Sequence, residues 1–161
     1  MEIYLADKND YSLVKHIVYH TIETIYPNYY PQGAVQYFLA LHHGNALRQA
    51  LAQGEVYLLK FQKQWVATAS INGNAISRLF VLPQFQGMGC GTRLMDEMES
   101  FIFSEYDMIT LSSSWPAYQM YLNRGYSPVS YHQIVTDNGH VLCYQQMEKY
   151  ADKDPPKSCV D

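Results

Sequence analysis

The chain has 161 residues, of which 48% are hydrophobic and 16% are charged, and its formal net charge at pH 7 is −4. This length and composition fit one folded domain with a hydrophobic core and exclude a disordered chain. The sequence contains no block of lysine and arginine. A nucleic-acid partner is therefore not expected, and the acidic balance mildly favours a cationic partner such as an amine.

The N-terminal sequence and the cysteines bear on where the protein resides. Residues 1–7 lack the basic and apolar regions of a signal peptide, and no apolar run approaches the length of a membrane span. The three cysteines, Cys90, Cys143 and Cys159, are scattered and odd in number, which argues against a disulfide framework. We therefore expect a cytoplasmic protein with no membrane partner.

The N-terminal third is predicted to be a short strand followed by helices. Residues 2–6 form the strand, and apolar residues between 13 and 25 then recur at helical spacing until Pro27 ends the helix. After a loop rich in aromatic residues, two shorter helical stretches begin near Pro31 and Asn45. This end of the chain should therefore contribute helices to one side of a sheet.

The remainder alternates between strands and helices. Period-two patterns and turn signals predict strands at 55–61, 65–71, 75–82, 108–112, 131–136 and 141–147. Two helices are expected among them, one after a glycine-rich loop and one at 116–123. In the first, the apolar stripe should comprise Leu94, Met95, Met98, Phe101 and Ile102, with Asp96, Glu97 and Glu99 facing water.

This order of elements predicts an α/β (α+β) fold. The expected architecture is a mixed, largely antiparallel central sheet of about seven strands flanked by about four helices. Residues 1–150 should form a single domain, and residues 151–161, rich in proline and charge, a disordered tail.

A glycine-rich segment joins the strand ending at Leu82 to the next helix. It comprises Gln86, Gly87, Met88, Gly89, Cys90, Gly91 and Thr92. Glycines at alternate positions let the backbone approach a ligand closely, and N–H groups at a helix start can converge on an anion. The segment therefore predicts an anion site, and a glycine-rich turn without a ligand is the competing interpretation.

Two other phosphate-binding loops fit this segment poorly. A dinucleotide fingerprint would place its third glycine where Thr92 stands. A P-loop closes with a Gly-Lys pair, and this chain has Thr92 and Arg93 there. A dinucleotide-type protein is kept as a third hypothesis, which predicts stabilisation by NAD or ATP.

With the residues before it, the segment resembles the signature of the GCN5-related N-acetyltransferases (GNAT). That family shows Val-x-Pro, a short gap, and then Arg or Gln-x-x-Gly-x-Gly or Ala. Here Val81-x-Pro83 precedes Gln86-x-x-Gly89-x-Gly91. The order of elements resembles the family over nearly the whole chain, which implies the GNAT fold and acetyl-coenzyme A as cofactor.

The resemblance also implies which residues contact the cofactor. The backbone of Leu79, Phe80 and Val81 would pair with the pantetheine arm as if it were another strand. The segment from Gln86 to Thr92 would hold the pyrophosphate.

A second motif follows between Ser114 and Tyr126. The family often shows Asn-x-x-Ala, then a tyrosine closely followed by Gly-Phe or Gly-Tyr. Here Ala117, Tyr121, Gly125 and Tyr126 match. Tyr121 aligns with the tyrosine that protonates the departing thiolate in many members. A phenol with a pKa near about 10 suits that role, although a packing tyrosine on an amphipathic helix is the alternative.

Several positions depart from the family pattern. Ser114 stands where the family has asparagine; with Ala117 it would still contact the pantetheine arm. Asn123 replaces a frequent lysine. Ala75 and Ser77 occupy positions where many members carry a glutamate, so the general base is unassigned and a water relay is one option.

Other titratable residues give weaker signals. Glu23, His42 and His132 are minor candidates for the base. His16 and His20 have the spacing of helical metal ligands, but Ile17 stands where the zinc-protease motif needs glutamate, so no metal is expected. Cys90 lacks a histidine partner and is expected to be a small packing residue.

The acceptor is expected against the first two helices and the aromatic loop. Tyr26, Tyr29, Tyr30 and Phe38 could line its pocket, although a core role is equally open for each. An aromatic lining would suit a cation or an aromatic amine.

The resemblance and the residues together predict an acetyl-coenzyme A-dependent N-acetyltransferase. It would move an acetyl group to a primary amine of a small molecule or peptide by direct attack in a ternary complex. The alternative is a non-catalytic coenzyme A-binding sensor, which the missing carboxylates at Ala75 and Ser77 favour. Exposed strand edges also make a homodimer an expectation.

Overall fold

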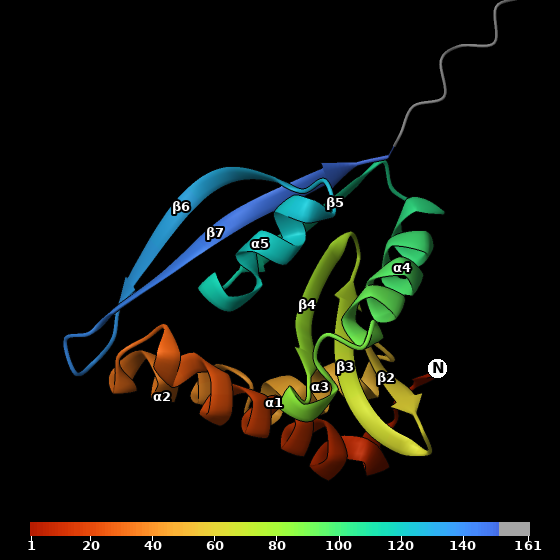
Figure 1. The fold of residues 1–161 in the computed structure, drawn as a ribbon, viewed down its shortest axis with the longest axis horizontal. Coiled ribbons are helices and arrows are strands. Elements are labelled where there is room, and N and C mark those ends of the chain that lie inside the picture. Colours follow the sequence, from red (N-terminus) through yellow and green to blue (C-terminus); the bar gives the residue numbers. More distant parts are fainter. Residues whose placement is uncertain (152–161) are drawn as a thin grey trace, which may run out of the picture.

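Seven strands form one mixed sheet in the order β1-β2-β3-β4-β5-β7-β6. The structure is a computed structural model and describes residues 1–151 (Figure 1). Its strands are β1 (Glu2–Leu5), β2 (Val56–Phe61), β3 (Gln64–Asn72), β4 (Ala75–Val81), β5 (Met108–Ser113), β6 (Ser127–Val135) and β7 (Val141–Tyr150). Its helices are α1 (Tyr11–Ile25), α2 (Gln32–Leu41), α3 (Asn45–Ala52), α4 (Cys90–Phe103) and α5 (Trp115–Asn123), with short 3-10 turns η1 (Lys8–Asp10), η2 (Tyr26–Asn28) and η3 (Pro83–Phe85).

The expected mixed, largely antiparallel sheet of about seven strands is confirmed. Five α-helices flank it, because Gly44, with a φ of 65°, separates α2 from α3. None of the helices within residues 1–151 is long and apolar enough to cross a membrane. The predicted disordered tail, apart from Ala151, lies outside the described residues.

The only parallel neighbours in this sheet, β4 and β5, pair over just two positions. Ala75 lies opposite Thr110 and Ile76 opposite Leu111, and no further pairs join these strands. Beyond Ile76 the two strands separate, so one edge of β4 has no strand beside it. This separation sets the position of the site described below.

Strand β3 is covered on both faces. Residues 66–70 are all buried, although successive side chains of a strand point to opposite faces. Helices α1 and α4 both contact β3, so each covers one of its faces. The apolar face of α1, which the helical spacing predicts, contributes the buried residues Val14, Ile17, Val18 and Ile22.

Helix α4 departs from the predicted orientation at two residues. Phe101 was expected in the core but is 44% exposed and packs against Tyr57 at the rim, with ring centroids 5.6 Å apart. Glu99 was expected in water but is buried, because Arg124 and Lys149 both donate to its carboxylate at 3.0 and 2.8 Å. These two ion pairs therefore allow Glu99 to be buried where the sequence pattern predicts exposure to solvent.

The β6–β7 hairpin is a long arm that reaches across to α2 (Figure 1). The predicted Asp137-Asn138-Gly139 turn lies at its tip, with Gly139 at a φ of 79°. Gly33 on α2 lies against this tip, and a Cβ at that position would collide with the side chains of His140 and Asn138. A glycine on α2 thus permits the contact between the arm and the helix.

The charge cluster on α4 gives a stability prediction. Burial opposes ionisation of Glu99, but hydrogen bonds from Arg124 and Lys149 outweigh it and lower the pKa of the carboxyl. Glu99→Gln should cost about 2 kcal/mol in free energy of unfolding at pH 7, measured by urea denaturation. Because the folded pKa is lowered, this contribution is full above the unfolded value near 4.5 and lost as the pH falls through the folded value.

The matched control on the same helix is Glu97→Gln. Glu97 pairs with Arg93 at 2.6 Å, but both side chains are about a third exposed or more. Solvent screening should hold its effect below about 0.5 kcal/mol. Equal losses for the two variants would contradict a special role for Glu99.

Candidate functional site

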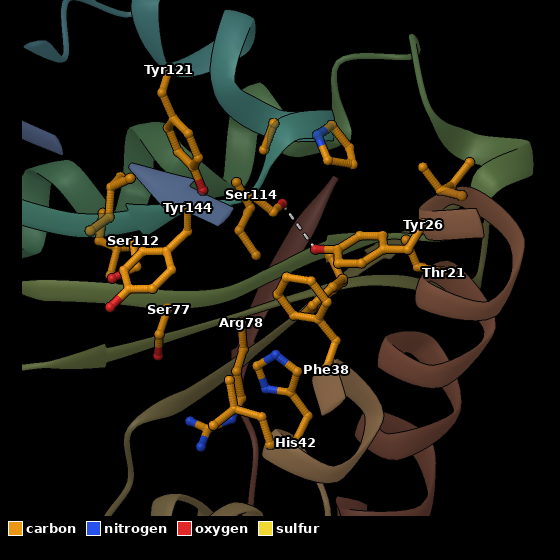
Figure 2. A pocket seen from close by; sticks show the side chains of 18 of the residues that line it. Thr21, Tyr26, Phe38, His42, Ser77, Arg78, Ser112, Ser114, Tyr121 and Tyr144 are labelled. Atoms are coloured by element: carbon orange, nitrogen blue, oxygen red, sulfur yellow. Dashed lines mark hydrogen bonds between the residues drawn. The ribbon is translucent and has the colours of Figure 1, made fainter. Parts of the chain in front are cut away.

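A cavity of about 1030 Å³ lies where β4 and β5 separate. Its walls come from α1 and α2, from β4, from β5 and α5, and from the β6–β7 arm. Figure 2 shows Tyr121 and Ser114 on one side of it and Phe38 and His42 on another, with the Arg78 side chain extending from β4 past His42. Segments far apart in sequence therefore meet around one space.

The edge of β4 offers unpaired backbone groups to this cavity. The Leu82 N–H donates to the Val66 carbonyl in β3 at 2.9 Å. Because peptide groups alternate in direction along a strand, the N–H and C=O of Val81 and the C=O of Leu79 point away from β3. Thr21 Oγ1 donates to the Val81 carbonyl at 3.2 Å, in agreement with that direction.

The end of β4 is held in place by two side chains. Buried Thr21 donates to the Val81 carbonyl from α1, and Gln86 Nε2 donates to the same oxygen at 2.9 Å. Gln86 lines the cavity, but its side chain is turned back onto β4. The Val81 carbonyl is thus occupied, and the Val81 N–H is the group left facing the cavity.

The glycine loop forms an open turn beside the cavity. Gly87 and Gly89 have φ values of 75° and 81°, and Gly89 begins α4 with no side chain capping the helix. A Cβ at Gly87 would meet nothing within 4 Å, so space lies in front of the turn. The loop residues after Gln86 do not line the cavity itself. Met88 is exposed and Cys90 is buried, and burial raises the pKa of the Cys90 thiol.

Tyr121 brings its ring from α5 to the cavity wall. It is 6% exposed and packs edge-on against Tyr126, with ring centroids 5.5 Å apart. Its hydroxyl makes no hydrogen bond with any of residues 1–151. Burial, with a smaller effect from Tyr26, raises the pKa of Tyr121 well above its usual value. The phenol therefore stays protonated and free to donate.

The aromatic residues predicted around the acceptor divide into two groups. Tyr26, Tyr29 and Phe38 line the cavity, and the Tyr26 and Ser114 hydroxyls lie 3.0 Å apart. Tyr30 does not line it. The Tyr30 hydroxyl accepts the N–H of Trp115 at 2.8 Å and donates to the carbonyl of Cys143 at 3.3 Å. Tyr30 thus links η2 to α5 and β7 behind the wall.

The three minor candidates for a base lie in different places. Glu23 lies in a separate small recess with Lys15 and Tyr19. His132 stacks on Tyr144 on the exposed arm, with ring centroids 5.0 Å apart. His42 alone lines the cavity, where burial and then Arg78 lower its pKa to about 4.

The sequence reasoning missed Arg78 as a cavity residue. Arg78 has a φ of 51°, and it lies where the pairing of β4 with β3 shifts by one residue, between Thr68 and Ser70. Its guanidinium lies beside His42 in Figure 2. A bulge leaves no local sequence signal, and strand alternation alone gives the wrong face for such a residue.

Comparisons with known proteins agree with this geometry. The sequence profile described as "Acetyltransferase (GNAT) domain" matches residues 25–151, and the chain belongs to this family. No curated protein matches the chain by sequence.

Three solved structures share the fold. A GCN5-related N-acetyltransferase from Rhodopseudomonas palustris has a TM-score of 0.84 at 22% identity, covering 93% of this chain and 95% of that one. The PaiA N-acetyltransferase from Thermoplasma acidophilum, solved with coenzyme A, has a TM-score of 0.71 at 14% identity, covering 93% and 98%. A ribosomal-protein-alanine N-acetyltransferase from Brucella melitensis has a TM-score of 0.67 at 18% identity, covering 94% and 100%.

The protein is thus an N-acetyltransferase whose acetyl donor is acetyl-coenzyme A. The residues present fit that cofactor. An unpaired strand edge can accept a peptide-like arm, and an uncapped helix start behind two glycines can accept a pyrophosphate. The open space in front of Gly87 leaves room for such a group.

Proposed function

We propose that the chain acetylates a primary amine of a small molecule or peptide by direct attack in a ternary complex. One observation carries this proposal: a single cavity is lined by the free edge of β4, by Tyr121 and by aromatic residues of η2 and α2. Donor and acceptor can therefore be held together in one space, without a covalent intermediate on the protein.

The donor is assigned to the side of the cavity formed by β4 and α4. The backbone of Leu79 and Val81 pairs with the pantetheine arm, and Ser114 and Ala117 contact it from α5. The loop from Gln86 to Thr92, with the N–H groups that open α4, holds the pyrophosphate.

Acetyl-coenzyme A supplies a thioester whose carbonyl carbon accepts the amine and whose sulfur departs. The Val81 N–H donates a hydrogen bond to the thioester oxygen as negative charge develops there. Tyr121 donates its phenolic proton to the departing sulfur, which its raised pKa permits because the phenol remains protonated at neutral pH. The proton lost by the amine balances this transfer.

Within the described part of the chain, no carboxylate is placed to deprotonate the acceptor amine. Among the described residues that line the cavity, none is aspartate or glutamate. His42 is neutral at pH 7, but a group with a pKa of about 4 is a weak base for an ammonium. The amine therefore enters the reaction in its free form, or loses its proton to water.

This assignment predicts that the pH dependence of kcat/KM is set by the pKa of the acceptor amine and not by a group on the protein. Neither His42, with its lowered pKa, nor Tyr121, with its raised pKa, titrates between about pH 6 and 9. The value of kcat/KM should rise tenfold per pH unit until it levels at the pKa of the acceptor amine. Two acceptors with amine pKa values about two units apart should give plateaus displaced by that amount. A plateau at the same pH for both would instead reveal a base on the protein.

The experiment that tests the proposed function follows thiol release from acetyl-coenzyme A with a panel of amines. Tyr121→Phe should lower kcat by about 100-fold with little change in coenzyme A affinity, because general acid catalysis contributes on that scale. Tyr118→Phe is the matched control, since Tyr118 is a half-buried tyrosine on α5 that does not line the cavity.

The outcomes distinguish the enzyme from the sensor. Tight binding of coenzyme A without turnover of any amine would favour the sensor, which the missing carboxylate in the cavity supports. Equal activity of Tyr121→Phe and the unaltered protein would remove Tyr121 from the reaction.

The glycine loop gives a prediction for donor binding. Gly89→Ala places a Cβ in a left-handed residue at the start of α4, in front of the N–H groups assigned to the pyrophosphate. Coenzyme A affinity, measured by calorimetry, should fall by at least about tenfold, with a cost of about 1 kcal/mol in free energy of unfolding. Gly139→Ala imposes the same strain at the arm tip and should cost similar stability while leaving the affinity unchanged. Equal affinity losses would contradict this assignment.

A cytoplasmic location and a homodimer belong to the same proposal. The odd number of cysteines supports the first. The exposed residues of β6, at the edge of the sheet, support a second copy of the chain as partner.

A further inference from the structure

Among residues 1–151, one permanently charged group lines the cavity, and it is a cation. Among the described residues lining it, Arg78 carries a full charge, His42 is neutral at pH 7, and there is no acidic side chain. A positively charged acceptor, such as a polyamine, would find repulsion and no counter-charge here. A negatively charged group on the acceptor would find a partner.

Arg78 has almost none of its hydrogen bonds satisfied within residues 1–151. The guanidinium carries five N–H donors, and its one contact is from Nη1 to Ser70 Oγ at 3.5 Å. Its Nε is buried without any partner, and no described carboxylate lies within ion-pairing distance. Glu55, the acid that most affects Arg78, instead accepts a hydrogen bond from Asn72 Nδ2 at 2.5 Å. Buried guanidinium donors in native proteins are usually paired, whereas most donors of Arg78 have no partner among the described residues.

His42 lies next to this unsatisfied group and is itself unsatisfied. Its Nδ1 is buried with no hydrogen-bond partner, and its ring packs edge-on against Phe80, 5.2 Å away. A neutral imidazole can donate or accept a hydrogen bond. Two unpartnered polar atoms therefore lie on two side chains that both line the cavity.

The backbone at Arg78 also departs from regular strand geometry. A φ of 51° is uncommon for a residue other than glycine and costs roughly 1 kcal/mol or more. It arises at the bulge, where two residues of β4 oppose one residue of β3. The bulge turns the Arg78 side chain to the cavity wall beside α2, where a regular strand would place it differently.

Resting on the proposed acetyl transfer, we propose that the acceptor is an amine that also carries a carboxylate, which Arg78 binds through paired N–H donors while His42 supplies a further hydrogen bond. The planar guanidinium matches a carboxylate in bidentate geometry. The apolar part of the acceptor packs against Phe38, Tyr26 and Leu41. The substrate class is an amino acid or related amino carboxylate with an aromatic or aliphatic body.

The amine of such an acceptor must reach the end of β4. Arg78 and Val81 are three residues apart, which is about 10 Å along a strand. The reach of the arginine side chain spans much of that separation, so both α-amino acids and longer amino carboxylates are included. The carboxylate anchors one end of the acceptor, and the amine lies near the Val81 N–H.

The test compares matched acceptors that differ only in the anionic group. Phenylalanine, phenylalaninamide and phenethylamine share one body, and leucine with its amide and a series of ω-amino acids extend the panel. Rates are corrected for the fraction of free amine. At least one amino carboxylate should exceed its own amide in kcat/KM by about 10- to 100-fold, the range expected for a charged hydrogen-bonded pair.

Variants locate this preference at Arg78. Arg78→Met should raise KM for the amino carboxylate by about 10- to 100-fold and change kcat/KM for the matched amide by less than about threefold. Arg78→Lys, which keeps the charge but loses the bidentate geometry, should fall between them. Glu55→Gln is the control for a purely structural pairing and should leave the preference unchanged. Binding of the N-acetylated amino carboxylate, measured by calorimetry, gives a readout without turnover and should weaken in Arg78→Met.

Three outcomes separate this inference from the proposed function. If coenzyme A binds but no amine is acetylated, the acetyl transfer itself fails. If amines are acetylated but every amide equals or exceeds its acid, the carboxylate site is overturned while the transfer stands. Equal losses for acid and amide in Arg78→Met would make the residue structural. A phosphonate analogue preferred over the carboxylate would also overturn the assignment.

Discussion

The separation of β4 from β5 is the constraint on which the rest of the site depends. Two parallel residue pairs join these strands at one end. On its other side, β5 pairs with β7 along its whole length, which extends the sheet to the β6–β7 arm. Backbone N–H and C=O groups on the edge of β4 beyond Ile76 are thus left without the hydrogen bonds that a neighbouring strand would supply. The same separation makes room for α5 to bring Tyr121 to the cavity. The proposed donor binding and the proposed acid catalysis therefore both depend on a single interruption of the sheet.

Burial determines the charge of the groups around that opening. It raises the pKa of Tyr121 and lowers that of His42, so both are neutral at pH 7. Arg78 is half-buried too, but a guanidinium keeps its proton. The wall therefore presents neutral donors and acceptors and one fixed positive charge. An apolar environment of this kind strengthens each remaining electrostatic contact with a substrate.

Local sequence signals predicted the parts of the structure that depend on neighbouring residues. The glycine loop, the helix after it and the Asp137-Asn138-Gly139 turn each carry their backbone requirements within a few residues. Contacts between distant segments were beyond such signals. The bulge at Arg78, the burial of Glu99 and the hydrogen bonds that draw Tyr30 behind the wall all depend on partners 8 to 113 residues away. Local signals accordingly covered the elements assigned to the donor better than the long-range contacts around the proposed acceptor side.

The contact between Gly33 and the tip of the β6–β7 arm affects the acceptor side of the cavity without involving a residue that lines it. Ile134, Leu142 and Tyr144 of the arm line the cavity, yet the arm is seated through a glycine that lines nothing. A bulkier residue at that position would displace the side chains of His140 and Asn138 at the tip of the arm. A residue outside the cavity lining can thus alter how the arm is seated over the proposed acceptor side, remote from the proposed donor site on β4 and α4.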